Sequence, residues 1–305
     1  MVVSEAIHES HEPLGDQSRV LIVGAGVVGH AEGIALLQHG HDVVFSDVDE
    51  AVLSHRATEG LQTAPSTALG LVGFDAVLIS VSTPSSAGEV DLRNLEAAAA
   101  AIGVALGKAS SVEPGRYRVV IVRSTVPPGT TDDIVIPLLE AEAGLRAGPD
   151  FGVCMSPEYI RQRKAVSDSI APRLVVIGQL DERSGDVAER LNAGFGCPIY
   201  RVPIREAEFQ KYAHNLCNAS KIAFFNELRR VADTIDVDAQ SAFALVAKSS
   251  EAMWNPEYGT QDLGPYGGAC LPKDLEAFLS WAERNGLDLP LLSAVKRSNH
   301  PTPAP

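Results

Sequence analysis

The chain has 305 residues, of which 45% are hydrophobic and 21% are charged, and its formal net charge at pH 7 is −14. At roughly one domain per ~150 residues this length suits two domains, and the composition excludes a disordered chain. The negative balance argues against a nucleic-acid partner, because such binding comes mainly from neutralised phosphates, and against docking on an anionic membrane.

The targeting and redox features of the sequence favour a cytoplasmic protein. The longest apolar runs, such as Ala76–Val81, are far shorter than the ~18–20 residues of a membrane helix. Residues 1–17 are acidic and polar and lack the basic start and apolar stretch of a signal peptide. The four cysteines form no C-x-x-C pair, which favours neither a disulfide framework nor a zinc site. We therefore expect free thiols and no metal site.

Residues 1–18 are typical of a flexible N-terminal extension, and regular elements begin at residue 19. Short apolar runs predict strands at Val20–Val23, Asp42–Ser46, Ala76–Val81, Arg118–Arg123, Phe151–Met155, Leu174–Ile177 and Ile199–Val202. Helical spacing predicts helices between them at Ala31–His39, Leu92–Leu106, Thr130–Ala143 and Glu182–Ala193. Strands that alternate with helices predict an α/β fold with a Rossmann-type, doubly wound parallel sheet over residues 19–203.

The second part of the sequence predicts helices only, in a domain over residues 204–305. Glu206–Asp233 contains no Pro or Gly and predicts one long central helix. Further helices are predicted at Ala239–Lys248, Lys273–Asn285 and Pro290–Arg297. The long helix carries the apolar residues Leu216, Ile222, Phe224, Phe225, Leu228 and Val231. This is more apolar surface than a small helical domain covers, so we expect a homodimer through this helix; burial within its own chain is the alternative.

A glycine-rich stretch follows the first predicted strand and opens a helix, which is the context in which G-x-G-x-x-G binds a dinucleotide. The first glycine permits a tight turn, the second lets the backbone approach a pyrophosphate, and the third lets helix and strand pack closely. The predicted contacts are Gly24, Gly26, Val27, Val28 and Gly29. Asp47 ends the second strand, where a carboxylate accepts hydrogen bonds from the adenosine ribose and repels a 2′-phosphate. The interpretation is therefore an NAD site rather than an NADP site; the alternative is a turn with purely structural glycines.

The stretch Gly264–Asp274 contains a candidate nucleophile. Two glycines lie close before Cys270 and permit a substrate to approach the backbone. A helix start and Lys273 follow it, and both favour a thiolate. We interpret Cys270 as a catalytic thiol and the other cysteines as small core residues; these are Cys154, Cys197 and Cys217.

Several further motifs accompany the glycine loop and this thiol. They are Thr83-Pro84, which matches a strand-end T-P; Arg123–Thr130, which matches K-S-T-V-P-x-G-T; Ser156–Arg161, which matches N-P-E-F-L-R with Ser156 in place of Asn; and Ala207–Asn215 with Lys221–Glu227, which match a long central helix. On these motifs, over roughly residues 19–300, the chain resembles the UDP-glucose/GDP-mannose dehydrogenase family. That resemblance implies NAD-dependent oxidation of the C6 primary alcohol of a nucleotide sugar to a carboxylate, with two NAD consumed.

The resemblance also implies roles for individual residues. Cys270 would capture the aldehyde as a thiohemiacetal, and a second hydride transfer would leave a thioester. Lys211 and Asn215, one helical turn apart on one face, would stabilise the oxyanion. The group that would hold the water of proton transfer and hydrolysis is Asp274, Glu158 and Thr125. The cofactor site would also include Thr83, Pro84, Ser124 and Thr125.

Plain structural roles remain open for three of these residues when the sequence is considered without the family. Lys211 could form a surface pair with Glu208, Asn215 could be polar packing, and Asp274 could be an acid in the first turn of a helix.

Two departures from the family change the expected substrate. The chain ends at Asn299–Pro305, where the family continues into a third domain that holds the nucleotide. Glu50–Phe74 replaces a Pro-Gly-rich segment, so we expect a smaller lid or none. We therefore expect oxidation of a small sugar-like or nucleoside substrate, with UDP-glucose and GDP-mannose as poor substrates. The alternatives are a dehydratase that oxidises, eliminates and re-reduces with bound NAD, a truncated UDP-sugar 6-dehydrogenase, and a non-catalytic NAD-binding regulator.

Overall fold

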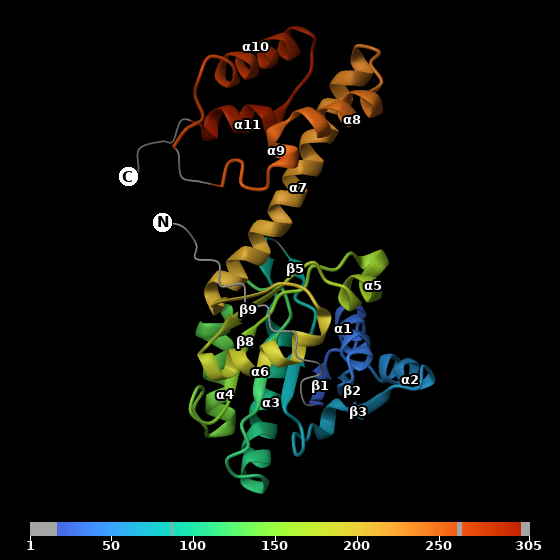
Figure 1. Cartoon of the computed structure of the whole chain (residues 1–305), viewed down its shortest axis with the longest axis vertical. Coiled ribbons are helices and arrows are strands. Elements are labelled where there is room, and N and C mark those ends of the chain that lie inside the picture. The colour runs from blue at the N-terminus through green and yellow to red at the C-terminus, as the bar shows by residue number, and fades with distance from the viewer. Residues whose placement is uncertain (1–16, 87, 261–263, 300–305) are drawn as a thin grey trace. The chain divides into compact units, whose positions relative to one another are not determined.

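The computed structural model describes residues 17–86, 88–260 and 264–299, so most of the predicted N-terminal extension at residues 1–18 lies outside the described residues. The chain divides into two compact units, Met1–Ala213 (unit 1) and His214–Pro305 (unit 2). Their boundary falls within the long helix α7 (Ile204–Thr234), which therefore contributes its first turns to unit 1 and the rest to unit 2 (Figure 1).

Unit 1 contains an eight-stranded sheet in the order β10-β9-β8-β7-β4-β1-β2-β3. The strands are β1 (Arg19–Val23), β2 (Asp42–Asp47), β3 (Gln62–Pro65), β4 (Ala76–Ile79), β7 (Val119–Val122), β8 (Gly152–Met155), β9 (Val175–Gln179) and β10 (Ile199–Pro203). In this sheet order, each strand from β8 through β7, β4, β1 and β2 to β3 runs parallel to its neighbour in that series. Strand β10 runs parallel to β9. The Rossmann-type prediction is confirmed, but β9 runs antiparallel to β8, a step that apolar runs cannot reveal because they carry no strand direction.

Helices cover both faces of this sheet, as the doubly wound prediction requires. They are α1 (Val27–Gln38), α2 (Glu50–Thr58), α3 (Arg93–Val112), α4 (Ile136–Ala143), α5 (Ala165–Ile170) and α6 (Glu182–Asn192). A π-helical turn, Thr131–Val135, leads into α4, and the short strands β5 (Ser85–Ser86) and β6 (Glu89–Val90) form a separate hairpin. Alternate residues of each strand enter two different cores: Leu21 packs with the α3 side chains, and Ile22 packs with Leu36 of α1.

Helix α3 is long and apolar enough, by length and composition, to cross a membrane. Its apolar residues do not form one uninterrupted run, because Gly103, Gly107 and Lys108 lie among them. In the structure Leu95, Ile102 and Leu106 of α3 are buried in the core beneath the sheet. This packing accounts for the apolar composition of the helix.

Unit 2 is all-helical over its described residues, as predicted. It contains most of α7 and also α8 (Ala239–Ser249), α9 (Glu251–Trp254), α10 (Leu271–Arg284) and α11 (Pro290–Ser298). Val231 of α7 joins Ala282, Leu289 and Leu292 in its core. Buried Glu227 of α7 accepts hydrogen bonds from the first N–H groups of α11, those of Leu291 and Leu292, at 2.8 and 3.1 Å. One carboxylate therefore satisfies a helix start that would otherwise lack partners.

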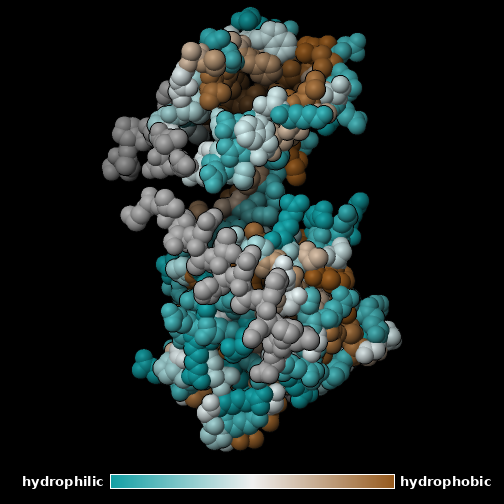
Figure 2. Space-filling view, in the orientation of Figure 1, coloured by the Kyte–Doolittle hydropathy of each residue, from teal (hydrophilic) through white to brown (hydrophobic). Residues whose placement is uncertain are grey.

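The apolar residues of α7 fall into two groups. Phe224, Leu228 and Val231 pack into the core of unit 2, as the alternative of burial within the chain predicted. Leu216 and Ile222 instead are 61% and 63% exposed. Figure 2 shows hydrophobic atoms exposed among polar ones over the helices of this unit, including α8.

The start of α7, which belongs to unit 1, is bound to the rest of that unit by a second buried carboxylate. Glu208 has 0% exposure and accepts hydrogen bonds from the N–H groups of Gly129 and Thr131, the latter at 2.8 Å. These amides begin the helical segment that leads into α4, so Glu208 caps it. Glu208 is therefore not the partner of Lys211 in a surface pair.

Replacement of Glu208 tests this cap. Glu208→Ala leaves two buried N–H groups without acceptors, and we expect it to lower the free energy of unfolding by about 3 kcal/mol. Urea denaturation followed by circular dichroism measures this. Glu206→Ala, at an exposed position on the same helix, is the control, and we expect a change below about 0.5 kcal/mol. Equal effects of the two substitutions would contradict the cap.

Candidate active site

The glycine loop has the geometry of a phosphate cradle. Gly24 adopts φ +97°, where a side chain is strained, and a Cβ there would lie 2.6 Å from the Ser80 carbonyl oxygen. A Cβ at Gly29 would lie 1.9 Å from the Gly24 carbonyl oxygen, so only glycine permits this approach of helix to turn. A Cβ at Gly26 would meet nothing within 4 Å. The open side of Gly26, at the start of α1, is thus where a pyrophosphate fits the free N–H groups of the helix.

Asp47 lies beside this loop at the carboxyl end of β2. Its Oδ2 accepts a hydrogen bond from the Ala25 N–H at 2.7 Å, and its Oδ1 accepts one from the Asp49 N–H at 2.9 Å. These bonds hold the carboxylate at the loop, and each oxygen keeps lone-pair capacity for a ribose hydroxyl. Asp49 is exposed and caps α2 by accepting the Ala51 N–H.

The loops after β4 and β7 are joined by hydroxyl groups. Thr83 Oγ1 donates to the Thr125 carbonyl oxygen at 2.7 Å, and Ser124 Oγ donates to the Val81 carbonyl oxygen at 2.6 Å. Thr125 is half-buried and Pro84 is exposed at the same edge of the sheet. The hydroxyl proton of Ser124 is therefore used within the protein, and a contact of Ser124 with the cofactor stays a prediction.

A buried ion pair lies at the same edge, between the loop after β8 and α7. Lys211 Nζ lies 3.0 Å from Glu158 Oε1, with the two side chains 5% and 15% exposed. The ammonium also donates to the Glu158 carbonyl oxygen and lies 5.4 Å from the centre of the Tyr159 ring. Glu158 Oε2 accepts the Ile160 N–H at 2.7 Å. The structure thus brings together two of the predicted catalytic residues, a desolvated cation and a carboxylate held by two donors.

Tyr159 adds a third polar contact between this loop and α7. Its hydroxyl donates to Gln210 Oε1, and burial raises the pKa of Tyr159 to about 12. Gln210 and Lys211 are adjacent on α7, so the loop after β8 holds two successive residues of the helix.

The remaining predicted catalytic residues belong to unit 2 and are exposed there. Asn215 lies on α7, one helical turn after Lys211. Cys270 is the N-cap of α10, which confirms that a helix begins directly after the thiol. Asp274 lies in the first turn of α10, and Lys273 Nζ lies 2.9 Å from its carboxylate. The effect of Lys273 on the thiol stays a prediction.

The other three cysteines differ in their surroundings. Burial raises the pKa of Cys154, in the sheet core, to about 12, and it also raises the pKa of half-buried Cys197. Cys217 is exposed on α7, so its interpretation as a core residue is wrong. Amphipathic spacing alone could not decide this, because α7 has exposed apolar positions as well as buried ones.

Sequence reasoning missed a buried polar cluster beneath the site. Arg123, directly after β7, forms an ion pair with Glu32 of α1 and donates to Ser156. A signal was present: Glu32 is a charged residue on the side of α1 that carries Gly29 and Gly33. For Ser156 the sequence showed only that it replaces the Asn of a motif, and it did not indicate a contact with Arg123.

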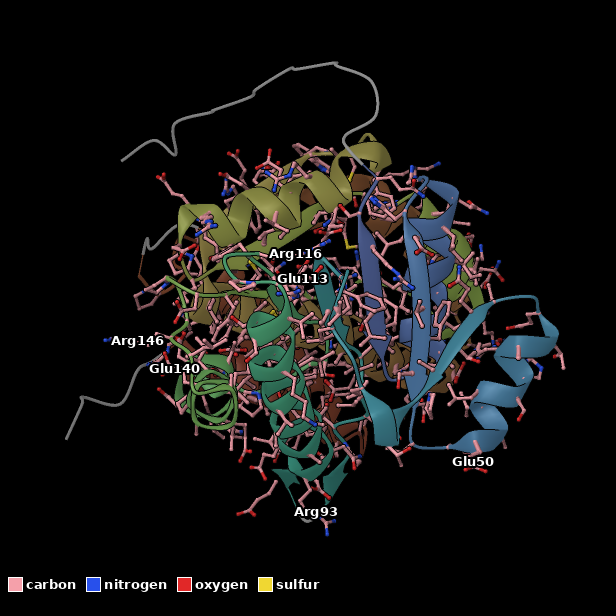
Figure 3. The ribbon with its side chains drawn as sticks, turned by 90° about the horizontal axis from the view of Figure 1, so that it is seen from below. Glu50, Arg93, Glu113, Arg116, Glu140 and Arg146 are labelled. Carbon is pink, nitrogen blue, oxygen red and sulfur yellow. The ribbon has the colours of Figure 1, made fainter. Side chains whose placement is uncertain are left out.

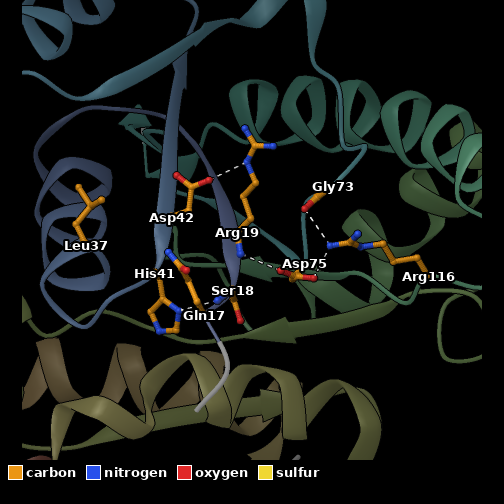
Figure 4. Close-up of a pocket in the computed structure, with 9 residues that line it drawn as sticks. All are labelled: Gln17, Ser18, Arg19, Leu37, His41, Asp42, Gly73, Asp75 and Arg116. Atoms are coloured by element: carbon orange, nitrogen blue, oxygen red, sulfur yellow. Dashed lines mark hydrogen bonds and ion pairs between the residues drawn. The ribbon is translucent and has the colours of Figure 1, made fainter. Parts of the chain in front are cut away.

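The amino edge of the sheet, opposite the site, holds a pocket of about 430 Å³ (Figure 4). Its charged groups are already paired: Arg19 with Asp42 at 3.0 Å, and Arg116 with Asp75 at 2.8 Å. Figure 3 shows Glu113 beside Arg116 at the end of α3, and these two form a further ion pair of 3.2 Å. Ligands of doubly wound sheets bind at the carboxyl ends of the strands. The pocket at the amino edge is therefore not the candidate active site.

Comparisons with known proteins agree with the geometry of the carboxyl edge. The family model "UDP-glucose/GDP-mannose dehydrogenase family, NAD binding domain" matches residues 49–195, and the model of the central domain matches residues 205–301. GDP-mannose 6-dehydrogenase of Pseudomonas putida is 33% identical over 302 aligned residues, covering 92% of this chain and 68% of that protein.

Two solved structures give the same result. The ternary complex of GDP-mannose dehydrogenase from Pseudomonas aeruginosa has a TM-score of 0.83 and 32% identity, with 92% of this chain and 68% of that chain covered. The UDP-glucose dehydrogenase of Pyrobaculum islandicum has a TM-score of 0.68 and 33% identity, with 93% and 68% covered.

A dinucleotide cradle on a Rossmann-type sheet, followed by a helical unit, defines the class as NAD-dependent dehydrogenases. The chain belongs to the UDP-glucose/GDP-mannose dehydrogenase family. Its cofactor is NAD, which the residues of the glycine loop and Asp47 fit.

The contribution of Asp47 to cofactor choice can be measured. Asp47→Ala removes a carboxylate that can accept ribose hydroxyls and also leaves the Ala25 N–H unpaired, so we expect NADH affinity to fall about tenfold or more. Calorimetric titration of NADH measures this. Asp49→Asn keeps the helix cap and is the control that we expect to leave affinity unchanged. Tighter binding of NADPH than of NADH by the unsubstituted protein would contradict the assignment.

Proposed function

We propose that this chain oxidises a sugar hydroxyl to a carboxylate with two molecules of NAD and that Cys270 is the catalytic thiol. The observation that carries the proposal is the buried pair of Lys211 and Glu158 at the carboxyl edge of a sheet whose β1 end holds the dinucleotide loop. A desolvated ammonium at such an edge suits the stabilisation of a developing oxyanion, because the low dielectric strengthens its field.

The proposed reaction balances as a four-electron oxidation. One primary alcohol, one water and two NAD⁺ give one carboxylate, two NADH and three protons. NAD accepts a hydride in each of the two oxidation steps. The Cys270 thiolate adds to the aldehyde carbon between them, and after the second oxidation the resulting thioester is cleaved by water, which returns the thiolate.

The residues of the chain would divide this work by their chemistry. Lys211 and Asn215 are donors on one face of α7 and suit the oxyanion of the thiohemiacetal. Glu158 is a carboxylate at hydrogen-bond distance from Lys211 and suits the acceptance of a proton from water. Thr125 and Asp274 complete the set that would hold this water.

The proposal of Cys270 as the nucleophile has support from exposure. Cys154 is buried and Cys197 is half-buried, and burial raises the pKa of both thiols, which disfavours their thiolates. Cys217 and Cys270 are exposed, and of these two only Cys270 directly precedes a helix. A helix N-terminus stabilises a thiolate, whereas the middle of α7 does not.

For the substrate we propose a sugar nucleotide with a free 6-hydroxyl, with GDP-mannose as the first candidate. The similar proteins of Pseudomonas are named for GDP-mannose, and the one from Pyrobaculum is named for UDP-glucose. The small sugar or nucleoside expected from the sequence remains the competing substrate class.

A substrate panel tests the reaction. GDP-mannose, UDP-glucose, free hexoses and nucleosides are each incubated with NAD, and NADH absorbance and product mass are followed together. We expect two NADH per product and a product that has gained one oxygen and lost two hydrogens. Cys270→Ser should abolish formation of the acid, with Cys217→Ser as the matched control that retains it.

Other outcomes of the panel identify the competing reactions. One NADH per product indicates a single oxidation, and loss of water without NADH indicates a dehydratase. Two NADH formed by a Cys270→Ser protein at the original rate would contradict the role of the thiol. Turnover of free hexoses or nucleosides but not of sugar nucleotides would contradict the proposed substrate.

We also propose that the chain forms a homodimer through α7. Its exposed apolar residues Leu216 and Ile222 lie on a helix without Pro or Gly, and Leu245 of α8 is exposed as well, at 64%. Large apolar side chains exposed on a helix are candidates for an interface between chains.

Light scattering at micromolar concentration tests the dimer. We expect twice the mass of one chain, and we expect Leu216→Glu with Ile222→Glu to give a monomer because charges on an apolar interface are costly. A double substitution at exposed polar residues of the same helix, Lys221→Glu with Arg229→Glu, is the control. A monomeric mass for the unsubstituted protein would contradict the proposal.

A further inference from the structure

One guanidinium joins three parts of the cofactor and reaction site. Arg123 Nη2 lies 2.6 Å from Glu32 Oε2 of α1, and the side chains are only 8% and 6% exposed. Arg123 Nη1 donates to Ser156 Oγ at 2.9 Å, and this hydroxyl donates to the Val176 carbonyl oxygen of β9 at 2.9 Å. The links therefore run from the cofactor helix to the end of β7, to the loop after β8, and on to β9.

This network contributes little net free energy to the stability of the fold. Desolvation of a buried ion pair offsets most of its Coulomb attraction, and well-packed apolar residues in its place are often neutral or stabilising. Arg123 Nε adds to the cost, because it is buried without a hydrogen-bond partner in the described part of the chain. The energetic balance therefore favours a role in positioning over a role in stability.

The three linked groups lie directly next to residues that the site uses. Glu32 belongs to α1, whose start carries the glycine loop. Arg123 immediately precedes Ser124 and Thr125, and Ser156 lies two residues before Glu158. The planar guanidinium of Arg123 donates to Glu32 and Ser156 in defined directions. It therefore sets the distance between α1 and the loop after β8.

Two of the positions at which the chain departs from the motifs of the resembling family meet in this network. Arg123 stands where the motif has Lys, and Ser156 stands where the motif has Asn. Arg123 donates a hydrogen bond to Ser156. The donor side chain is thus longer than the Lys of the motif, and the acceptor side chain is shorter than the Asn of the motif. Glu32 takes the second arm of the guanidinium.

We propose that Arg123 is a positioning residue that sets the distance between the cofactor helix and the loops after β7 and β8, through Glu32 and Ser156. Its consequence for NAD affinity depends only on the cofactor site. Its consequence for Thr125 and Glu158 rests on the proposed function.

Titration of NADH by fluorescence, well below the thermal midpoint of each variant, tests this. Arg123→Lys loses the fork, and we expect the NADH dissociation constant to rise about tenfold, as for other residues that orient a site through their neighbours. Ser156→Asn added to Arg123→Lys lengthens the acceptor, and we expect affinity to return to within about threefold of the unsubstituted protein. Glu32→Gln, which keeps the side-chain shape, should weaken NADH binding about tenfold and tests the same link if Arg123→Lys fails to fold.

Arg201→Lys is the matched control. Arg201 of β10 binds the side chains of Gln179, Asp186 and Glu189, but these lie outside the site. We expect its NADH affinity to be unchanged, whatever happens to its thermal midpoint. Unchanged NADH affinity in Arg123→Lys, or a loss that Ser156→Asn does not restore, would overturn the proposal. NADH binding needs neither Cys270 nor a substrate, so this result is independent of the proposed oxidation.

Discussion

The binding of the first turns of α7 to the ends of the sheet strands is the constraint on which the site depends. Glu208 caps the segment that leads into α4, Gln210 accepts the Tyr159 hydroxyl, and Lys211 binds Glu158. Each contact is buried or half-buried, so loss of one partner leaves a desolvated polar group. The part of α7 that carries Lys211 is therefore held in register with the loop that carries Glu158.

Helix α7 also provides a buried carboxylate to a helix start within unit 2. Glu227 accepts the first N–H groups of α11, as Glu208 accepts those before α4. A carboxylate at a helix start both satisfies orphan donors and interacts favourably with the helix dipole. In each unit α7 thus contributes a buried acid to another helix, which explains why a helix with so many polar residues is well anchored.

The fold and most of the cofactor site could be predicted from the sequence, because they depend on local patterns. Continuous apolar runs such as Val119–Val122 are typical of strands buried on both faces, and the glycine loop has its meaning from the strand before it and the helix after it. The edge strand β3 was missed, because its mostly exposed residues form no apolar run.

Side-chain partnerships between distant residues could not be predicted. Spacing along the helix left open a pair of Lys211 with Glu208, yet the partner of Lys211 is Glu158, which lies in a loop far away in the sequence. Glu32, Arg123 and Ser156 come from three separate segments, and only the order of the strands brings them together. The exposure of Cys217 likewise depends on which face of α7 unit 2 covers.

The central claim is that the pair of Lys211 and Glu158 performs chemistry and is not merely structural. The most direct test is the rate of NADH formation by the double variant Lys211→Met with Glu158→Gln, which leaves no unpaired buried charge. We predict a rate about 10³-fold below that of the unsubstituted protein on its best substrate, with NADH affinity within about threefold. A rate within about tenfold of the unsubstituted protein would contradict the claim.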